Sequence, residues 1–213
     1  MDQYIISKPV RTEIVVEKSR FICTLARVAS EQEAQDFIKK TRKEFWDATH
    51  NCTAYIIGGV PRAERSSDDG EPSGTAGSPM LEVLRKKELY NTAAVVTRYF
   101  GGIKLGAGGL TRTYGKAVTE AVKAAGLSKM VPMGHYAFTW SLDDVGRVLN
   151  LLYRQSLFAV HDVEYGSRAE IILEMKQAQV PEAEAWLTET LSKPVTLEEK
   201  HLFEAEQPVA AGV

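Results

Sequence analysis

Two polar, glycine-rich segments in the first half of the chain contain the residues best suited to binding or catalysis. The first, residues 65–77, here called the acidic loop, contains Asp68, Asp69 and Glu71 among glycines and hydroxyl side chains. These carboxylates could hold Mg²⁺, which prefers a few carboxylates together with water. They could also pair with basic residues or form an ordinary turn, because aspartate and glycine favour turns. The segment contains no histidine or cysteine, and these three interpretations stay open.

The second segment, residues 98–109, here called the basic loop, follows a predicted strand and opens a predicted helix. Backbone N–H groups at such a position can cradle an anion. The loop is not a Walker A motif, because Ala107 stands where that motif has lysine. It is not a dinucleotide fingerprint either, because Thr111 replaces the third glycine. The glycines expected to let backbone approach an anion or RNA are Gly101, Gly102, Gly106 and Gly108.

Basic residues surround this loop, and no acidic residue occurs between Glu88 and Glu120 to balance them. A helix predicted over residues 109–125 places Arg112 in its first turn, where a cation is unfavourable by roughly 0.3–1 kcal/mol unless an anion offsets it. That anion could be the acidic loop or a phosphate, and a solvated basic face is the remaining interpretation. The residues predicted to contact an anion or RNA are Arg98, Lys104, Arg112 and Lys116.

Three further residues are secondary candidates. His50 precedes a predicted strand, Arg65 opens the acidic loop, and Tyr99 could either stack on a base or belong to the core. No Gly-x-Ser-x-Gly elbow surrounds the serines of the acidic loop. We therefore assign no catalytic residue and favour a protein that is not an enzyme, without excluding one.

The first half of the chain alternates predicted strands and helices around these loops. Ser30 and Glu33 have the spacing of a capping box, which predicts a helix start. Residues 58–78 are rich in glycine, proline and charge and predict one long loop. The other predicted elements are strands over residues 14–16, 21–28, 53–57 and 92–97 and a helix over residues 78–88.

The second half predicts the element order β-α-β-β-α-β, which is that of a ferredoxin-like split βαβ domain. Its charge also differs: residues 1–135 carry 20 Lys and Arg against 15 Asp and Glu, and residues 136–213 carry 6 against 13. We therefore expect any polyanion to bind the first half, and a protein partner to bind the acidic second half as an alternative. The predicted domains are residues 1–133 and 134–205, followed by a frayed tail of residues 206–213.

Composition narrows the class of protein. The chain of 213 residues has no apolar run of the roughly 18–20 residues that a membrane span needs. Its first residues lack the pattern of a signal peptide, so we expect a cytoplasmic protein without membrane contact. The two cysteines, Cys23 and Cys52, lie in apolar stretches and are expected to be buried thiols. Nothing indicates oligomerisation, and we expect a monomer.

Several motifs together resemble the signature of the IMPACT family, in particular its bacterial YigZ-like branch. They are residues 19–22, 50–55, 68–77 and 96–106. The resemblance implies an α+β fold of two domains. The first is a left-handed βαβ domain similar to the fourth domain of elongation factor G. The second is a ferredoxin-like split βαβ domain similar to that factor's fifth domain.

The family's eukaryotic members regulate translation. The similarity of both domains to elongation factor G implies, by fold analogy, contact with structured RNA or the ribosome. We therefore predict a translation-associated RNA- or ribosome-binding regulatory protein that acts through residues 65–77 and 98–112. The alternatives are a small, Mg²⁺-dependent, phosphate-handling enzyme using the same loops, and a protein-binding adaptor. Outside the enzyme alternative we expect no cofactor.

Overall fold

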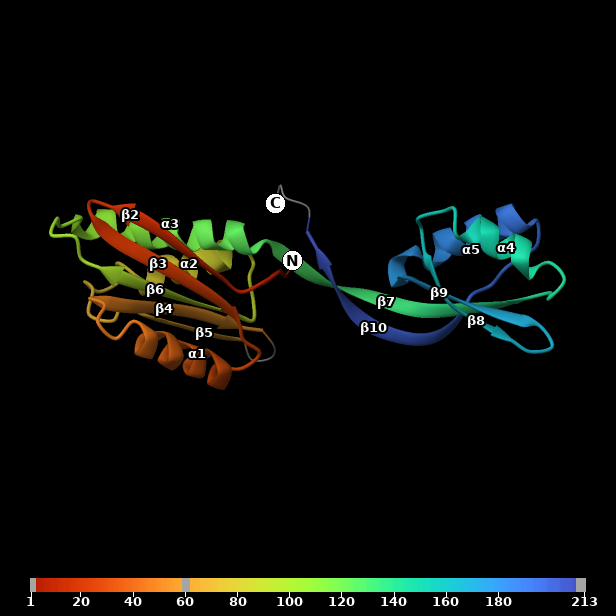
Figure 1. Ribbon diagram of the computed structural model, residues 1–213, viewed down its shortest axis with the longest axis horizontal. Coiled ribbons are helices and arrows are strands. Elements are labelled where there is room, and N and C mark those ends of the chain that lie inside the picture. The colour runs from red at the N-terminus through yellow and green to blue at the C-terminus, as the bar shows by residue number, and fades with distance from the viewer. Residues whose placement is uncertain (1–2, 59–61, 210–213) are drawn as a thin grey trace. The chain divides into compact units, whose positions relative to one another are not determined.

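The structure, a computed structural model, describes residues 3–58 and 62–209 and divides the chain into two compact units (Figure 1). Unit 1 comprises Met1–Lys129 with Pro208–Val213, and unit 2 comprises Met130–Gln207. Each unit combines helices with a sheet, which confirms the predicted two-domain α+β class. Among the described residues, no helix is long and apolar enough to cross a membrane.

Unit 1 contains a five-stranded sheet in the order β2-β3-β6-β4-β5, in which every neighbouring pair is antiparallel. Since β3 and β4 both pair with β6, they run parallel to each other with β6 between them. Helix α1 connects them, which makes a split βαβ unit. The elements are β2 (Val10–Val16), β3 (Ser19–Arg27), α1 (Glu31–Glu44), β4 (His50–Ile57), β5 (Ala63–Ser67) and β6 (Thr92–Tyr99).

Helices cover both faces of this sheet (Figure 1). Helix α1 packs on one face over a small core that includes Ala34, Tyr55 and Ile57. Helices α2 (Gly77–Lys86) and α3 (Gly106–Ala125) cover the other face. There the larger core of the unit, with Phe21 and Tyr114 in edge-to-face contact, lies beneath them.

The predicted capping box starts α1 as expected. The Ser30 hydroxyl accepts a hydrogen bond from the N–H of Glu33 at 3.2 Å, and the Glu33 carboxylate accepts one from the N–H of Ala29 at 2.8 Å. Both bonds satisfy backbone donors that have no partner within the helix.

Unit 2 is a ferredoxin-like domain. Its sheet order is β10-β7-β9-β8, and the chain visits these strands in the order β-α-β-β-α-β, as the sequence predicts. Helices α4 and α5 pack on one face of the sheet over a core that includes Val148, Leu187 and Ile171. The elements are β7 (Leu127–Trp140), α4 (Val145–Leu152), β8 (Ala159–Tyr165), β9 (Ala169–Lys176), α5 (Val180–Leu191) and β10 (Glu198–Pro208), with a 3₁₀ turn at Gln177–Gln179.

The observed division differs from the predicted boundary between residues 133 and 134. Unit 2 begins at Met130, inside a strand β7 that runs without interruption from Leu127. The change in charge along the sequence therefore falls within a strand. A linker composition does not mark the boundary because the chain has no linker there.

The predicted frayed tail of residues 206–213 is partly ordered strand. Strand β10 continues to Pro208, and Val209 donates its N–H to the carbonyl of Leu127 at 2.9 Å. Residues 210–213 lie outside the described part of the chain.

Two strands were not predicted. Strand β5 lies within the segment 58–78 that was predicted as one loop, of which residues 59–61 are outside the described structure. Its sequence, Ala63–Ser67, has no apolar alternation. It becomes a strand through its pairing with β4 and lies at the edge of the sheet. Strand β1 (Ile5–Ile6) is only two residues long and pairs with the start of β7.

Candidate anion-binding site

The acidic and basic loops meet at one pocket of unit 1. The pocket has a volume of about 450 Å³ and is bounded by the start of β4, the acidic loop, the end of β6 and the start of α3. This volume is within the range of small-ligand pockets. Its polar lining residues include Thr49, His50, Glu71, Arg98 and Lys104, with Phe100 and Leu105 among the apolar ones.

An ion pair between the two loops lies at this pocket. Arg98 Nη1 donates to Glu71 Oε1 at 2.6 Å, and only 6% and 3% of these side chains are exposed. Tyr114 of α3 donates its hydroxyl to the same oxygen at 2.8 Å. Burial raises the pKa of Tyr114, so this hydroxyl stays protonated and remains a donor. The Arg98 guanidinium also lies over the Phe21 and Phe100 rings, at 5.3 and 5.4 Å from their centroids.

The Nε–H of Arg98 is a buried donor that finds no hydrogen-bond partner within the described residues. A buried donor of this kind costs free energy until an acceptor reaches it, and more so when the donor is charged. Arg98 is also one of the residues that line the pocket.

Asp68 holds the acidic loop against the start of α2. Its carboxylate accepts backbone N–H bonds from Gly74 at 2.8 Å, Ala76 at 3.0 Å and Gly77 at 2.8 Å. Burial raises the pKa of the Asp68 carboxyl, but the bonds from these three N–H groups together outweigh it and bring the pKa below its ordinary value. Asp68 is therefore ionised and serves as an internal anchor.

Asp69 connects the loop to α1 and β4. Its carboxylate accepts from Arg42 at 2.9 Å and from the N–H of Asn51 at 2.6 Å, and its φ is +44°. The Asp69 carbonyl can only accept, so Nδ1 of His50, 2.8 Å away, is the donor. The Nε2 of His50 lies 3.8 Å from Oε2 of Glu71. These contacts, like those of Asp68 and Glu71, are internal and favour the loop-organising interpretation over the magnesium site.

The remaining basic candidates are exposed. Within the described chain, the side chains of Lys104, Arg112 and Lys116 make no hydrogen bond or ion pair. Helix α3 begins at Gly106, three residues earlier than predicted, so Arg112 lies in the second turn and not the first. The helix has no side-chain cap and no acidic residue in its first turn, so its first N–H groups are available to an anion.

Close packing or backbone conformation explains three glycines of the basic loop. A Cβ at Gly101 would overlap the carbonyl of Lys18, and the N–H of Gly101 bonds the Ser19 hydroxyl at 3.0 Å. Gly102 and Gly106 have φ values of +88° and +70°, a conformation that side-chain-bearing residues rarely adopt. Gly102 and Gly108 are exposed in the same segment.

Two secondary candidates lie away from the pocket lining. Tyr99 donates its hydroxyl to Asp47 at 2.8 Å, and Arg65 lies on the exposed face of β5, where it donates to the carbonyl of Glu64. His50, the third, does line the pocket. Tyr114 is a further pocket-side residue that was not among the candidates, because it lies on the buried apolar face of α3, where a core residue is expected.

Comparison with known proteins covers most of the chain. The Impact N-terminal domain model matches residues 17–122, and a domain of unknown function (DUF1949) matches residues 141–192. The IMPACT family member YvyE of Bacillus subtilis (strain 168) is 47% identical over 201 residues, which cover 92% of this chain and 90% of that protein. The chain belongs to the IMPACT family. The acidic loop, the basic loop and the pocket between them all lie within the Impact N-terminal match.

Another IMPACT protein and a solved structure are also similar to this chain. The IMPACT family member YigZ of Escherichia coli (strain K12) is 39% identical over 139 residues, 64% of this chain and 68% of that protein. A solved structure described as a hypothetical protein superposes with a TM-score of 0.58 at 31% identity, covering 94% of this chain and 98% of that one.

Proposed function

We propose that this IMPACT protein is a cytoplasmic, translation-associated regulator that binds structured RNA or the ribosome through the pocket between its acidic and basic loops. A backbone phosphate of the RNA enters the pocket and accepts a hydrogen bond from Nε–H of Arg98. Lys104, Arg112 and Lys116 contact flanking phosphates. The translation context comes from the family resemblance, and the chemistry comes from the pocket.

The unpartnered Nε–H of Arg98 is the observation that carries the proposal. The guanidinium is fixed by Glu71 on one side and by two aromatic rings, so it is held in position before a ligand arrives. A phosphate offers several acceptor oxygens and suits a guanidinium better than a neutral ligand does.

The surroundings of the pocket support the same ligand. The uncapped start of α3 at Gly106 provides backbone donors, and Lys104 lines the pocket without an internal partner among the described residues. Phe100 is 46% exposed beside Arg98, where its ring could stack on a base. A nucleotide within a longer strand therefore matches the site better than free phosphate does.

A binding titration tests the proposal. The purified protein is titrated with total cellular RNA and with ribosomes at low and moderate salt, beside the variant Lys104→Ala/Arg112→Ala. We expect log K to fall linearly with log salt, and the double variant to reduce that slope by roughly 1.5, because each lost phosphate contact removes about 0.7–0.9.

The matched control is Lys39→Ala/Lys43→Ala, which makes the same change in charge at exposed positions of α1 on the opposite face of the sheet. Its binding should equal that of the wild type. Absence of RNA and ribosome binding at low salt, or an equal loss in both double variants, would contradict the proposal.

A further inference from the structure

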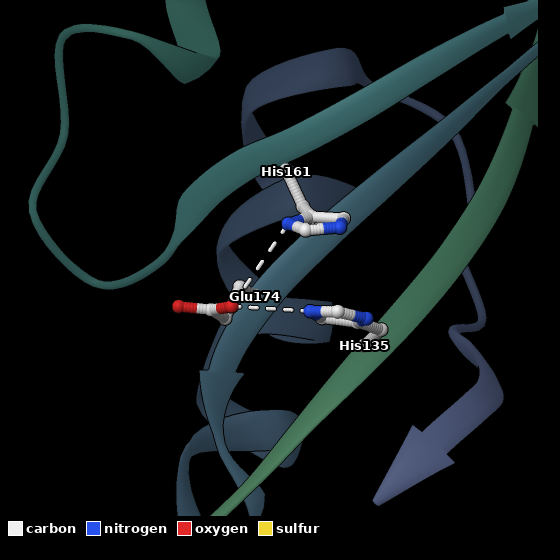
Figure 2. A group of neighbouring side chains, drawn as sticks. All are labelled: His135, His161 and Glu174. Atoms are coloured by element: carbon white, nitrogen blue, oxygen red, sulfur yellow. Dashed lines mark hydrogen bonds and ion pairs between the residues drawn. The ribbon is translucent and has the colours of Figure 1, made fainter. Parts of the chain in front are cut away.

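Three side chains that can bind metals converge on the sheet of unit 2 (Figure 2). His135 comes from β7, His161 from β8 and Glu174 from β9. One ligand atom from each lies within 4.8 Å of the other two. The chain has only four histidines, so finding two of them beside one carboxylate calls for an explanation.

The strand pairing places these residues on one face. His135 pairs directly with Glu174, and the neighbouring residue of β9, Leu173, is fully buried beneath α4 and α5. Since successive residues of a strand point to opposite faces, His135 and Glu174 lie on the face that the helices do not cover.

His161 lies on the same face because it follows Val160, whose side chain packs against the core, and a β-bulge lies at this position. The register of β8 shifts between Val160, which pairs with the core residue Leu173, and Asp162. The extra residue is His161, and its side chain lies beside Glu174. Bulges are frequent beside functional sites.

A hydrogen bond accounts for only one of the two contacts that the histidines make with Glu174. His135 Nε2 lies 3.1 Å from Oε2 of Glu174, within hydrogen-bonding distance, whereas Nδ1 of His161 faces the same oxygen at 3.9 Å, beyond it (Figure 2). The two imidazole rings stack with their centroids 3.8 Å apart. Zinc bonds of about 2.0–2.1 Å place tetrahedral ligand atoms about 3.3 Å apart, which small side-chain rotations would reach here.

We propose that His135, His161 and Glu174 form a binding site for one divalent transition-metal ion of the zinc class. Two imidazoles with one carboxylate suit zinc and its neighbours, whereas Mg²⁺ and Ca²⁺ prefer oxygen ligands alone. The side chains of His161 and Glu174 are 46% and 37% exposed, so the ion reaches the site from solvent and keeps one position open to water. Bound metal connects three strands and stabilises unit 2.

Isothermal titration of the full, tag-free, metal-stripped protein with Zn²⁺ tests this proposal, and Co²⁺ absorption reports the geometry. We expect one ion per chain with a Kd of about 10 µM or tighter. We expect His161→Ala and Glu174→Gln each to weaken binding at least tenfold.

The matched control is Glu164→Gln, which removes the same charge from an exposed position of β8 and should bind Zn²⁺ like the wild type. Melting without metal establishes that every variant folds. A wild-type Kd weaker than about 10 µM, or equal binding by wild type, His161→Ala and Glu174→Gln, would overturn the proposal. So would equal weakening by all three variants.

Discussion

Arg98 and Glu71 form an ion pair with a separation of 2.6 Å between Nη1 and Oε1, although both side chains are almost completely buried. Arg98 comes from the end of β6 and Glu71 from the acidic loop. The pair therefore fixes the loop on the sheet and, at the same time, fixes the guanidinium that lines the pocket.

Removing one partner of this pair should destabilise unit 1 strongly. Glu71→Ala leaves the Arg98 charge buried without a counterion, and we expect a loss of about 3–5 kcal/mol in the free energy of unfolding. Urea denaturation measures this loss. The control is Glu82→Ala, which breaks an exposed pair with Lys86 and should cost less than about 1 kcal/mol. Equal losses in the two variants would show that the buried pair is not important for folding.

Asp68 should make stability depend on pH. Burial raises the pKa of its carboxyl, but the three backbone N–H bonds together bring the pKa of the folded chain below the ordinary value. The stabilisation is therefore fully present above the unfolded pKa, about 3.9, and is lost as pH falls through the lower folded pKa.

The measurement compares the free energies of unfolding of the wild type and Asp68→Asn across pH. We expect the wild type to be more stable by a constant amount above about pH 5, and the difference to shrink below about pH 4. A difference that stays constant down to acid pH would mean that Asp68 is not ionised in this role.

Both cysteine thiols should resist alkylation in the folded protein. Burial raises the pKa of Cys52 to about 12 and raises the pKa of Cys23 as well, so neither is a thiolate near neutral pH. Cys52 also donates its S–H to the carbonyl of Asp68 at 2.9 Å. Mass spectrometry after iodoacetamide treatment should find no modification in buffer and two in urea. Rapid modification of Cys52 in buffer would contradict the buried arrangement.

The sequence predicted the elements whose local signals agree with their packing. Ser30 and Glu33 cap α1, and the apolar order of the second half gives the ferredoxin-like sheet of unit 2. Strand β5 could not be predicted, because Ala63–Ser67 is polar and becomes a strand only through its long-range pairing with β4.

The sequence predicted which segments form the candidate site, but not all of the residue pairs that hold those segments in place. The proposal that acidic and basic loops pair holds for Glu71 and Arg98, yet Asp69 pairs with Arg42 of α1. The metal-binding cluster of unit 2 was missed entirely. Its three residues are separated along the chain and meet only through the pairing register of three strands, which local sequence does not reveal.

Gly101 should tolerate no side chain. A Cβ there would overlap the Lys18 backbone, so Gly101→Ala must displace the basic loop, and we expect a loss of roughly 1–3 kcal/mol in unfolding free energy. Gly146→Ala is the control, because a Cβ in this α4 position meets nothing within 4 Å. That change should be neutral or stabilise by roughly 0.4–1 kcal/mol. Thermal or urea unfolding that ranks the two variants in the opposite order would contradict the close packing at Gly101.

The most direct test of the proposed function observes the Arg98 donor itself. In a ¹⁵N–¹H spectrum of the arginine Nε–H groups, the Arg98 signal is assigned through Arg98→Lys, which retains the charge but lacks this group. A structured RNA is then titrated into the wild-type protein. We predict that the Arg98 signal shifts and saturates together with binding. The signal of Arg85, whose Nε already donates to Glu64 at 2.7 Å, should stay in place. RNA binding that leaves the Arg98 signal unchanged would contradict the account.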